Sequence, residues 1–164
     1  SRHGQRGAVM TRILALTVWQ PWASLIAIGV KPYEFRGWAA PRAFRGQRIA
    51  IHAGTRPVRR KEITDLIYRL QGPEPWTTGL KPEALVFLEQ ASLNPGALPR
   101  SAIVCTAILG QPRRDAELIR EFGSPVNDSE REEYRSWAWP LTSIEEMQPP
   151  VPARGAQGFW EWRA

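Results

Sequence analysis

The chain has 164 residues, 43% hydrophobic and 23% charged, with a formal net charge of +6. This size and composition fit one globular domain that buries most of its apolar surface, and the single cysteine, Cys105, excludes an internal disulfide. No apolar stretch approaches the roughly 20 residues that span a bilayer, so we expect no membrane partner. The unpaired cysteine favours a reducing, cytoplasmic setting.

Residues 1–9 are polar and glycine-rich and lack the apolar core of a signal peptide. We interpret them as a leader outside the fold, with Met10 as the native start and 10–164 as a single domain. Arg2 and Arg6 supply two of the six net positive charges and the leader has no acid, which leaves +4 for the domain. This modest excess suits a polyanion such as RNA, although basic surfaces are often only solvated.

The first elements are well specified. Residues 12–18 read as a strand, and Pro21 then begins a short helix because its fixed φ is already helical. Trp22, Leu25 and Ile26 recur at helical spacing and should face the core.

Gly29 ends this helix at the position that usually needs a left-handed backbone. Residues 33–38 alternate as a strand, with aromatic side chains on one face and charged side chains on the other.

The middle of the chain mixes strands and helices. Residues 47–53 form a strand, 58–70 an amphipathic helix, and 71–99 a proline- and glycine-rich insertion with a short helix at 83–90. Residues 101–110 form a strand buried on both faces. This strand carries Cys105, which we interpret as a structural thiol and not as a nucleophile.

The last third is expected to contain a helix, a hydrophilic loop, two strands, a proline-rich connection and a final strand: 113–122, 127–133, 134–141, 144–147, 149–152 and 158–162. Short strands with a few helices between them predict an α+β fold.

Three stretches carry recognisable motifs. The first is Gln20-Pro21-Trp22-Ala23 followed by Gly29-x-Lys31-x-x-Glu34-x-Arg36. The second is Ile51-His52-Ala53, at the end of a strand. The third is Arg154-Gly155-x-Gln157-Gly158, followed by an aromatic residue and Trp160.

Together, and in this order, they resemble the ASCH domain of the PUA-like group, over residues 12 to 163 with the insertion unmatched. The resemblance implies a small PUA-like β-barrel with flanking helices and a role in RNA binding or RNA metabolism. Some bacterial members are amidohydrolases that remove acyl groups from modified cytidine, and others have been proposed to be nucleases.

Lys31, Glu34 and Arg36 would meet at the barrel mouth, Glu34 and Arg36 on one strand face about 7 Å apart. A carboxylate between two cations can hold a polar, planar ligand: Arg36 offers a fork to phosphate or a base edge, and Glu34 accepts from an amino group. The alternative is a surface ion pair of Glu34 and Arg36 with Lys31 solvated, worth at most about 1 kcal/mol.

Eight tryptophans suggest base stacking, which needs no particular base. Trp19, Trp38, Trp137 and Trp139 flank polar positions next to loops. Trp38 and the pair Trp137 and Trp139, which share a strand face, are the candidates, whereas Trp160 and Trp162, like Trp22, should pack the core. The candidate RNA- or nucleoside-binding residues are therefore Gln20, Lys31, Glu34, Arg36, Trp38, His52, Trp137, Trp139 and Arg154. A hydrogen-bonded structural role is the alternative for His52.

Three functions stay open: a binding domain for RNA or a modified nucleoside, a hydrolase, and a protein-interaction module. In a hydrolase of this group Lys31 and Glu34 would be catalytic. Glu34, however, stands where the amidohydrolases carry a threonine, and Ile108 where they carry an acid. We expect no cofactor and no zinc, because His52 and Cys105 are the only soft ligands beyond the leader, while magnesium or manganese stays open.

Overall fold

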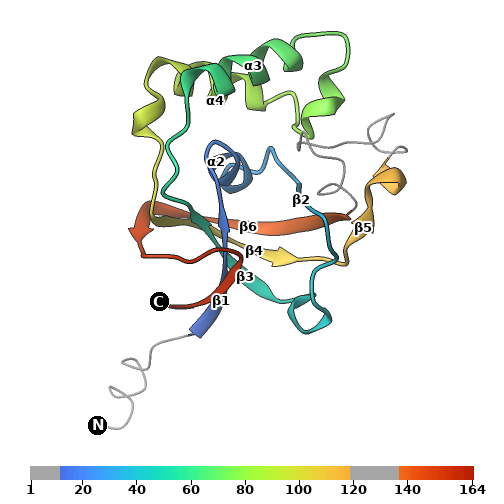
Figure 1. Cartoon of the computed structure of the whole chain (residues 1–164), viewed down its shortest axis with the longest axis vertical. Coiled ribbons are helices and arrows are strands. Elements are labelled where there is room, and N and C mark those ends of the chain that lie inside the picture. The colour runs from blue at the N-terminus through green and yellow to red at the C-terminus, as the bar shows by residue number, and fades with distance from the viewer. Residues whose placement is uncertain (1–11, 119–136) are drawn as a thin grey trace, which may run out of the picture.

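The computed structural model describes residues 12–118 and 137–164, which form a mixed seven-stranded sheet with three α-helices (Figure 1). In chain order the elements are β1 (Arg12–Val18), α2 (Trp22–Ala27), β2 (Tyr33–Arg36), the 3-10 turn η1 (Arg42–Phe44), β3 (Arg48–Ala53), α3 (Arg60–Leu70), η2 (Pro75–Thr78), α4 (Ala84–Leu93), η3 (Pro95–Ala97), β4 (Ala102–Leu109), β5 (Arg113–Arg114), η4 (Asp115–Leu118), β6 (Trp137–Pro152) and β7 (Phe159–Arg163). The α+β class predicted from the sequence is confirmed.

The sheet is open. Among the described strands the order is β2-β6-β4-β3-β1-β7, β5 also pairs with β6, and only β1 and β3 pair in parallel. No ladder joins the end strands β2 and β7 in the described residues, so the closed barrel expected from the sequence is not formed there. Aromatic packing connects the two ends of the sheet instead. Trp139 of β6, the strand next to β2, stacks on Phe159 of β7 with ring centroids 5.6 Å apart.

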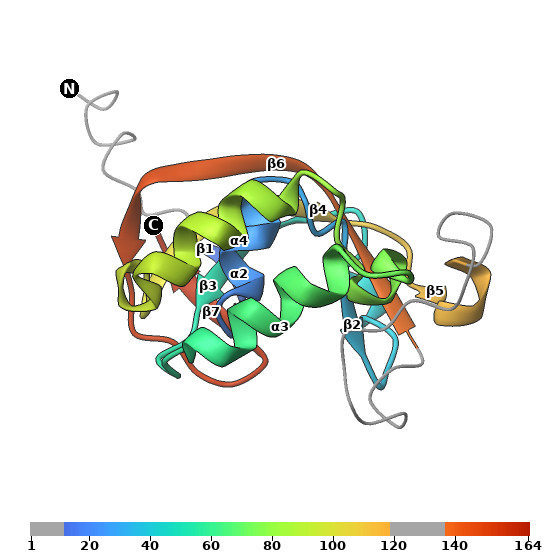
Figure 2. The same cartoon turned by 90° about the horizontal axis from the view of Figure 1, so that it is seen from above.

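The two largest of the four apolar clusters in the described residues stabilise the fold around α2. Helix α2 lies on the sheet, where Ile26 packs with Leu16, Ile51 and Leu109. Helices α3 and α4 lie beyond α2, away from the sheet, and run side by side (Figures 1 and 2).

The second core fills the space between these helices and α2, and its members include Leu25, Ile63, Leu66 and Leu88. Residues 71–99 therefore supply α4 and part of a core. Gly29 has φ +81°, as its helix-ending position requires.

The end of the chain differs from expectation because β6 is one continuous strand through Pro152. Pro149 and Pro150, expected in a connection, lie where the ladder with β4 shifts register, between the pairs Ile103–Val151 and Cys105–Glu146. A bulge of this kind needs no N–H from those positions, so the prolines cost no ladder hydrogen bond.

The helix expected at 113–122 is wrong over residues 113–118, and positions 119–122 lie outside the described residues. Arg113 and Arg114 form β5, and a single 3-10 turn follows. Arg113 donates to the Tyr33 hydroxyl over 3.0 Å, and the Arg114 guanidinium lies 4.3 Å from the ring centroid of Trp137. These tertiary contacts hold the pair against β6. The expected loop at 127–133 and the strand start at 134–136 lie outside the described residues.

In the part of the chain that the structure describes, no helix is both long and apolar enough to cross a membrane.

Candidate functional site

Lys31, Glu34 and Arg36 form a continuous ion chain below the surface. Lys31 Nζ lies 3.9 Å from Glu34 Oε1, and Arg36 Nη2 donates to Glu34 Oε2 over 2.9 Å. Lys31 is 1% and Glu34 5% exposed, so the alternative of a surface ion pair with a solvated lysine is wrong. The alternating pattern of β2 and the helix end at Gly29 bring the three side chains together, as the sequence motif predicts.

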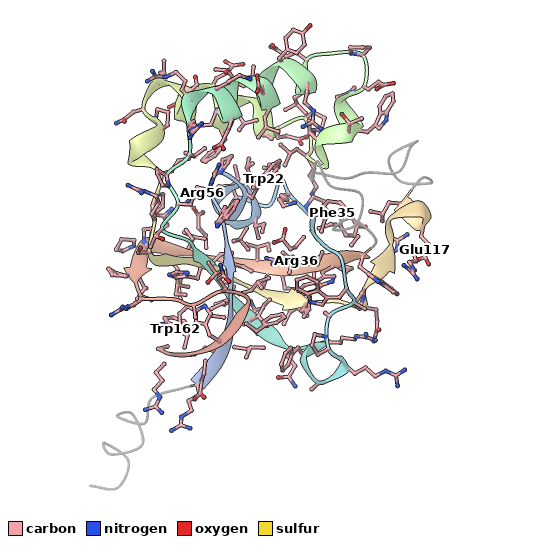
Figure 3. All side chains as sticks on the ribbon, in the orientation of Figure 1. Trp22, Phe35, Arg36, Arg56, Glu117 and Trp162 are labelled. Atoms are coloured by element: carbon pink, nitrogen blue, oxygen red, sulfur yellow. The ribbon has the colours of Figure 1, made fainter. Side chains whose placement is uncertain are left out.

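Aromatic rings surround this ion chain. Lys31 Nζ lies 5.0 Å from the ring centroid of Trp22 and 4.9 Å from that of Phe35. The Arg36 guanidinium lies 6.0 Å from Trp38 and 5.9 Å from Trp139 (Figure 3 shows Phe35, Arg36 and Trp22). Ring faces carry partial negative charge and replace some of the hydration that the buried cations lose.

The three tryptophans predicted to bind a ligand differ in exposure. Trp38 is 51% exposed, whereas Trp139 is fully buried and donates from Nε1 to the Trp38 carbonyl over 2.9 Å. Trp137 is half-buried beneath Arg114. Trp38 therefore offers the largest ring surface to solvent, and Trp139 supports it from the core.

Gln20 is 1% exposed and its amide is fully used. It donates to Ser24 Oγ and to the Pro99 carbonyl, both over 2.7 Å, and accepts from the Ser24 N–H. These bonds tie the start of α2 to the segment that precedes β4.

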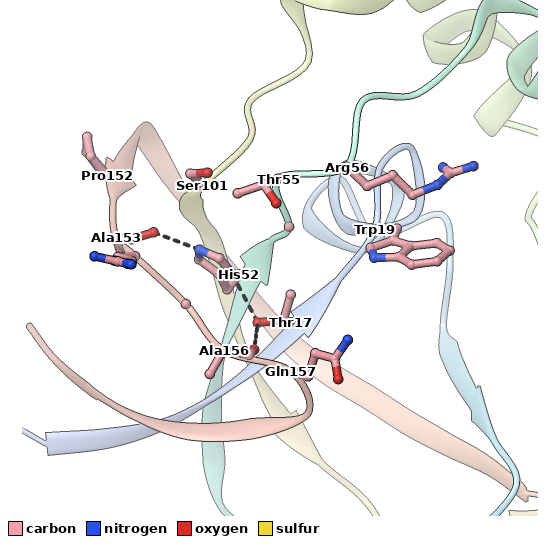
Figure 4. Close-up of a pocket in the computed structure, with 13 residues that line it drawn as sticks. Thr17, Trp19, His52, Thr55, Arg56, Ser101, Pro152, Ala153, Ala156 and Gln157 are labelled. Carbon is pink, nitrogen blue, oxygen red and sulfur yellow. Dashed lines mark hydrogen bonds between the residues drawn. The ribbon is translucent and has the colours of Figure 1, made fainter.

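A cavity of about 690 Å³ lies elsewhere, at the C-terminal ends of β1 and β3 (Figure 4). Of the candidate residues, His52 and Arg154 line it. The remaining lining residues were not among the candidates: Thr17, Trp19, Gly54, Thr55, Arg56, Ser101, Pro152, Ala153, Gly155, Ala156 and Gln157.

A hydrogen-bond network fixes one wall of this cavity. Thr17 Oγ1 donates to the Ala156 carbonyl over 2.7 Å, accepts from Trp160 Nε1 over 2.9 Å and lies 3.1 Å from His52 Nδ1. His52 Nε2 lies 2.8 Å from the Ala153 carbonyl. His52 is 2% exposed, and these contacts give it the structural role of tying segment 153–157 to β1 and β3.

At the other wall an arginine covers an exposed ring. Trp19 is 57% exposed, and the Arg56 guanidinium lies 4.6 Å from its ring centroid. The Glu62 carboxylate holds Arg56 by an ion pair and accepts the Arg59 N–H over 3.0 Å. The hydrogen bond from Arg56 lowers the pKa of Glu62, and the same bond raises the pKa of Arg56.

Thr17 joins the ion chain to the cavity. Its hydroxyl belongs to the cavity network, and its carbonyl accepts from Arg36 Nη2 over 3.3 Å. All three sequence motifs lie at or next to the cavity. Trp19 directly precedes the first motif, His52 belongs to the second and Arg154 to the third. Trp19 is one of the tryptophans that the sequence places next to a loop, and the convergence of the motifs could have indicated Thr17 beside it.

Metal binding and a cysteine nucleophile are two further chemistries that the described residues can be checked for. In the described residues no three His, Cys, Asp or Glu side chains are grouped to hold a metal ion. Burial raises the pKa of the Cys105 thiol to about 12, so this residue offers no nucleophile near neutral pH.

The chain was compared with known proteins. No family model matches the sequence. No curated protein matches it either.

Among solved structures, its fold is similar to that of ASCH from Zymomonas mobilis, with a TM-score of 0.50, 16% identity, and coverage of 92% of this chain and 87% of the other. A mutant of the same protein gives the same values. The structural neighbours are thus ASCH proteins, as the motifs predicted, and at this identity the likeness concerns the fold alone.

Proposed function

We propose that this chain is a binding domain for single-stranded RNA or a modified nucleoside. The observation that carries the proposal is the pair of solvent-exposed tryptophans, Trp19 and Trp38, each with a guanidinium against its ring. A base that stacks on such a ring gains about 1–3 kcal/mol whatever its identity, and a nearby arginine can hold the adjoining phosphate.

The buried candidates support this surface from below. Glu34 fixes the Arg36 guanidinium next to Trp38, and Lys31 offsets the charge of Glu34. Trp137, half-buried under Arg114, offers a further ring at the edge of β6. The ASCH-like fold and the net positive charge agree with an RNA partner, and the cytoplasmic setting stays a prediction.

The test is a titration of fluorescent single-stranded oligoribonucleotides at several salt concentrations. Binding should weaken as salt rises, because phosphate contacts release counterions. Trp38→Ala and Trp19→Ala should each weaken binding about tenfold, the loss of one stacked base. Tyr68→Ala is the matched control, because Tyr68 is an aromatic residue 81% exposed on α3. No binding at low salt, or an equal loss in the Tyr68 variant, would refute the proposal.

A second candidate is a hydrolase of acylated cytidine or RNA that uses Lys31 and Glu34. The buried, closely spaced lysine and carboxylate favour it, because such a pair can transfer protons. Incubation with acylated cytidine and with RNA, with and without divalent metal, tests for turnover. Turnover that survives Lys31→Ala would exclude this site assignment.

A further inference from the structure

We propose that the cavity between Trp19 and segment 153–157 binds a nucleoside phosphomonoester, and that the domain therefore prefers the phosphorylated end of an RNA strand. The proposal rests on the RNA-binding function above and specifies which part of the ligand lies at Trp19. The shared chemistry is a base, a ribose and a terminal phosphate, whether on a free mononucleotide or at a strand end.

The cavity has a suitable size. Its volume of about 690 Å³ lies inside the range of about 300–1,000 Å³ that small-molecule sites occupy. It is too small for a folded RNA, but it can accommodate one nucleotide. Hydroxyl groups of Thr55 and Ser101 and the edge of His52 line it beside apolar groups, a mixture that suits a ribose.

The charge of the lining favours an anion. Arg56, which is paired with Glu62 outside the lining, and Arg154 both line the cavity, and none of its lining residues is an aspartate or glutamate. One guanidinium group can bind two oxygens of a phosphate at once, through two parallel N–H donors. A phosphomonoester carries about −1.5 to −2 charge at neutral pH, more than the single charge of an internal phosphodiester.

The main chain adds donors. Residues 154–157 line the cavity, and their amide N–H groups donate to no acceptor within the described residues. Backbone amides on a concave segment stabilise bound anions, as in phosphate-binding loops. Segment 153–157 can therefore contribute hydrogen bonds to a phosphate that Arg154 attracts.

The base has a defined place. Arg56 covers Trp19 from one side, yet 57% of the residue is exposed. Gly54 keeps the ring accessible: a Cβ there would lie 3.3 Å from Trp19 Cδ1 and 3.2 Å from Thr17 Cγ2. A base can thus stack on Trp19 while its phosphate points toward Arg154.

The closed wall favours a strand end. The bonds of Thr17 and His52 to the Ala156 and Ala153 carbonyls hold segment 153–157 across one side of the cavity (Figure 4). An RNA strand that enters past Trp19 meets this wall and cannot continue through it. The nucleotide inside the cavity is therefore the terminal nucleotide of the strand.

The experiment compares oligoribonucleotides of one sequence that carry a 5′-phosphate, a 3′-phosphate or hydroxyls at both ends, by fluorescence anisotropy. One phosphorylated form should bind about tenfold more tightly than the hydroxyl form, the value of a charge-assisted contact. Arg154→Ala should remove this preference. Arg163→Ala, which deletes the same charge at an exposed position on β7 away from the cavity lining, should keep it.

The outcomes separate the two proposals. Trp38→Ala should weaken all oligomers alike and leave the end preference intact. Equal affinity for all three ends, or a preference that survives Arg154→Ala, overturns the cavity assignment while RNA binding stands. If no oligomer binds but cytidine monophosphate binds with dependence on Arg154, the cavity assignment holds and the RNA function fails.

Discussion

Gly155 packs directly against the imidazole of His52. A Cβ at position 155 would lie 2.5 Å from His52 Cε1, closer than real carbon contacts allow, and 3.0 Å from Trp160 Cζ2, tighter than most such contacts. The rings of His52 and Trp160 are themselves edge-to-face, with centroids 5.2 Å apart. The glycine of the C-terminal motif is thus explained by a close approach of the backbone to a histidine ring.

Gly155→Ala should therefore displace His52 and loosen segment 153–157. We expect a destabilisation of about 1–3 kcal/mol, typical of an overpacked site, measured by urea unfolding. Gly96→Ala is the control, because a Cβ there meets only Asn94 Oδ1, at 3.7 Å. Equal stability of the two variants would show that segment 153–157 does not pack against His52 in the way that the structure places it.

The buried ion chain should matter strongly for stability. Glu34→Ala leaves Lys31 and Arg36 without their shared carboxylate, and breaking a buried pair in this way costs about 3–5 kcal/mol. Glu161→Ala, which breaks a pair with Arg12 whose side chains are 63% and 52% exposed, should cost under about 1 kcal/mol. Urea unfolding of both variants compares them, and a small effect at Glu34 contradicts the chain's structural role.

The Arg56–Glu62 pair predicts a pH-dependent stability. Because the hydrogen bond from Arg56 lowers the folded-state pKa of Glu62 below its ordinary 4.5, the ionised carboxylate stabilises the folded state. That contribution is complete above pH 4.5 or so and is lost as the pH falls through the lowered pKa.

Glu62→Gln should then lower the free energy of unfolding at neutral pH, and with it the melting temperature. The loss should be at most about 1 kcal/mol, because both groups are partly exposed. The difference in melting temperature should shrink on acidification below about pH 4.5, where protonated Glu62 resembles glutamine. A difference that grows in acid would show that the sign is wrong.

Cys105 should resist thiol reagents in the folded protein. Burial raises the pKa of its thiol to about 12, so at pH 8 only about one part in ten thousand is thiolate. Labelling with a chromogenic disulfide should be negligible until urea unfolds the chain. Rapid labelling under native conditions would mean that β4 opens or that this side chain reaches solvent.

Much of the fold follows from local pattern. The patterns of residues 12–18, 47–53 and 101–110 predicted strands and the glycine at position 29 predicted a helix end, and the structure contains all four. The motif spacing brought Lys31, Glu34 and Arg36 together correctly, because side chains two apart on a strand share a face. The burial of this group could not be read locally, since it depends on Trp22 and Trp139, which come from two other segments.

What the sequence determined by itself is the class of fold and the membership of the ion chain, because both depend on residues close together in the chain. Tertiary structure alone decided which tryptophans remain exposed and where the cavity lies. Thr17, His52 with Arg56, and Arg154 come from three segments that are distant in sequence, and they meet only because β1 pairs with β3 and segment 153–157 folds back over both strands. Pairing between distant strands is set by the burial of the whole sheet, which no local spacing records.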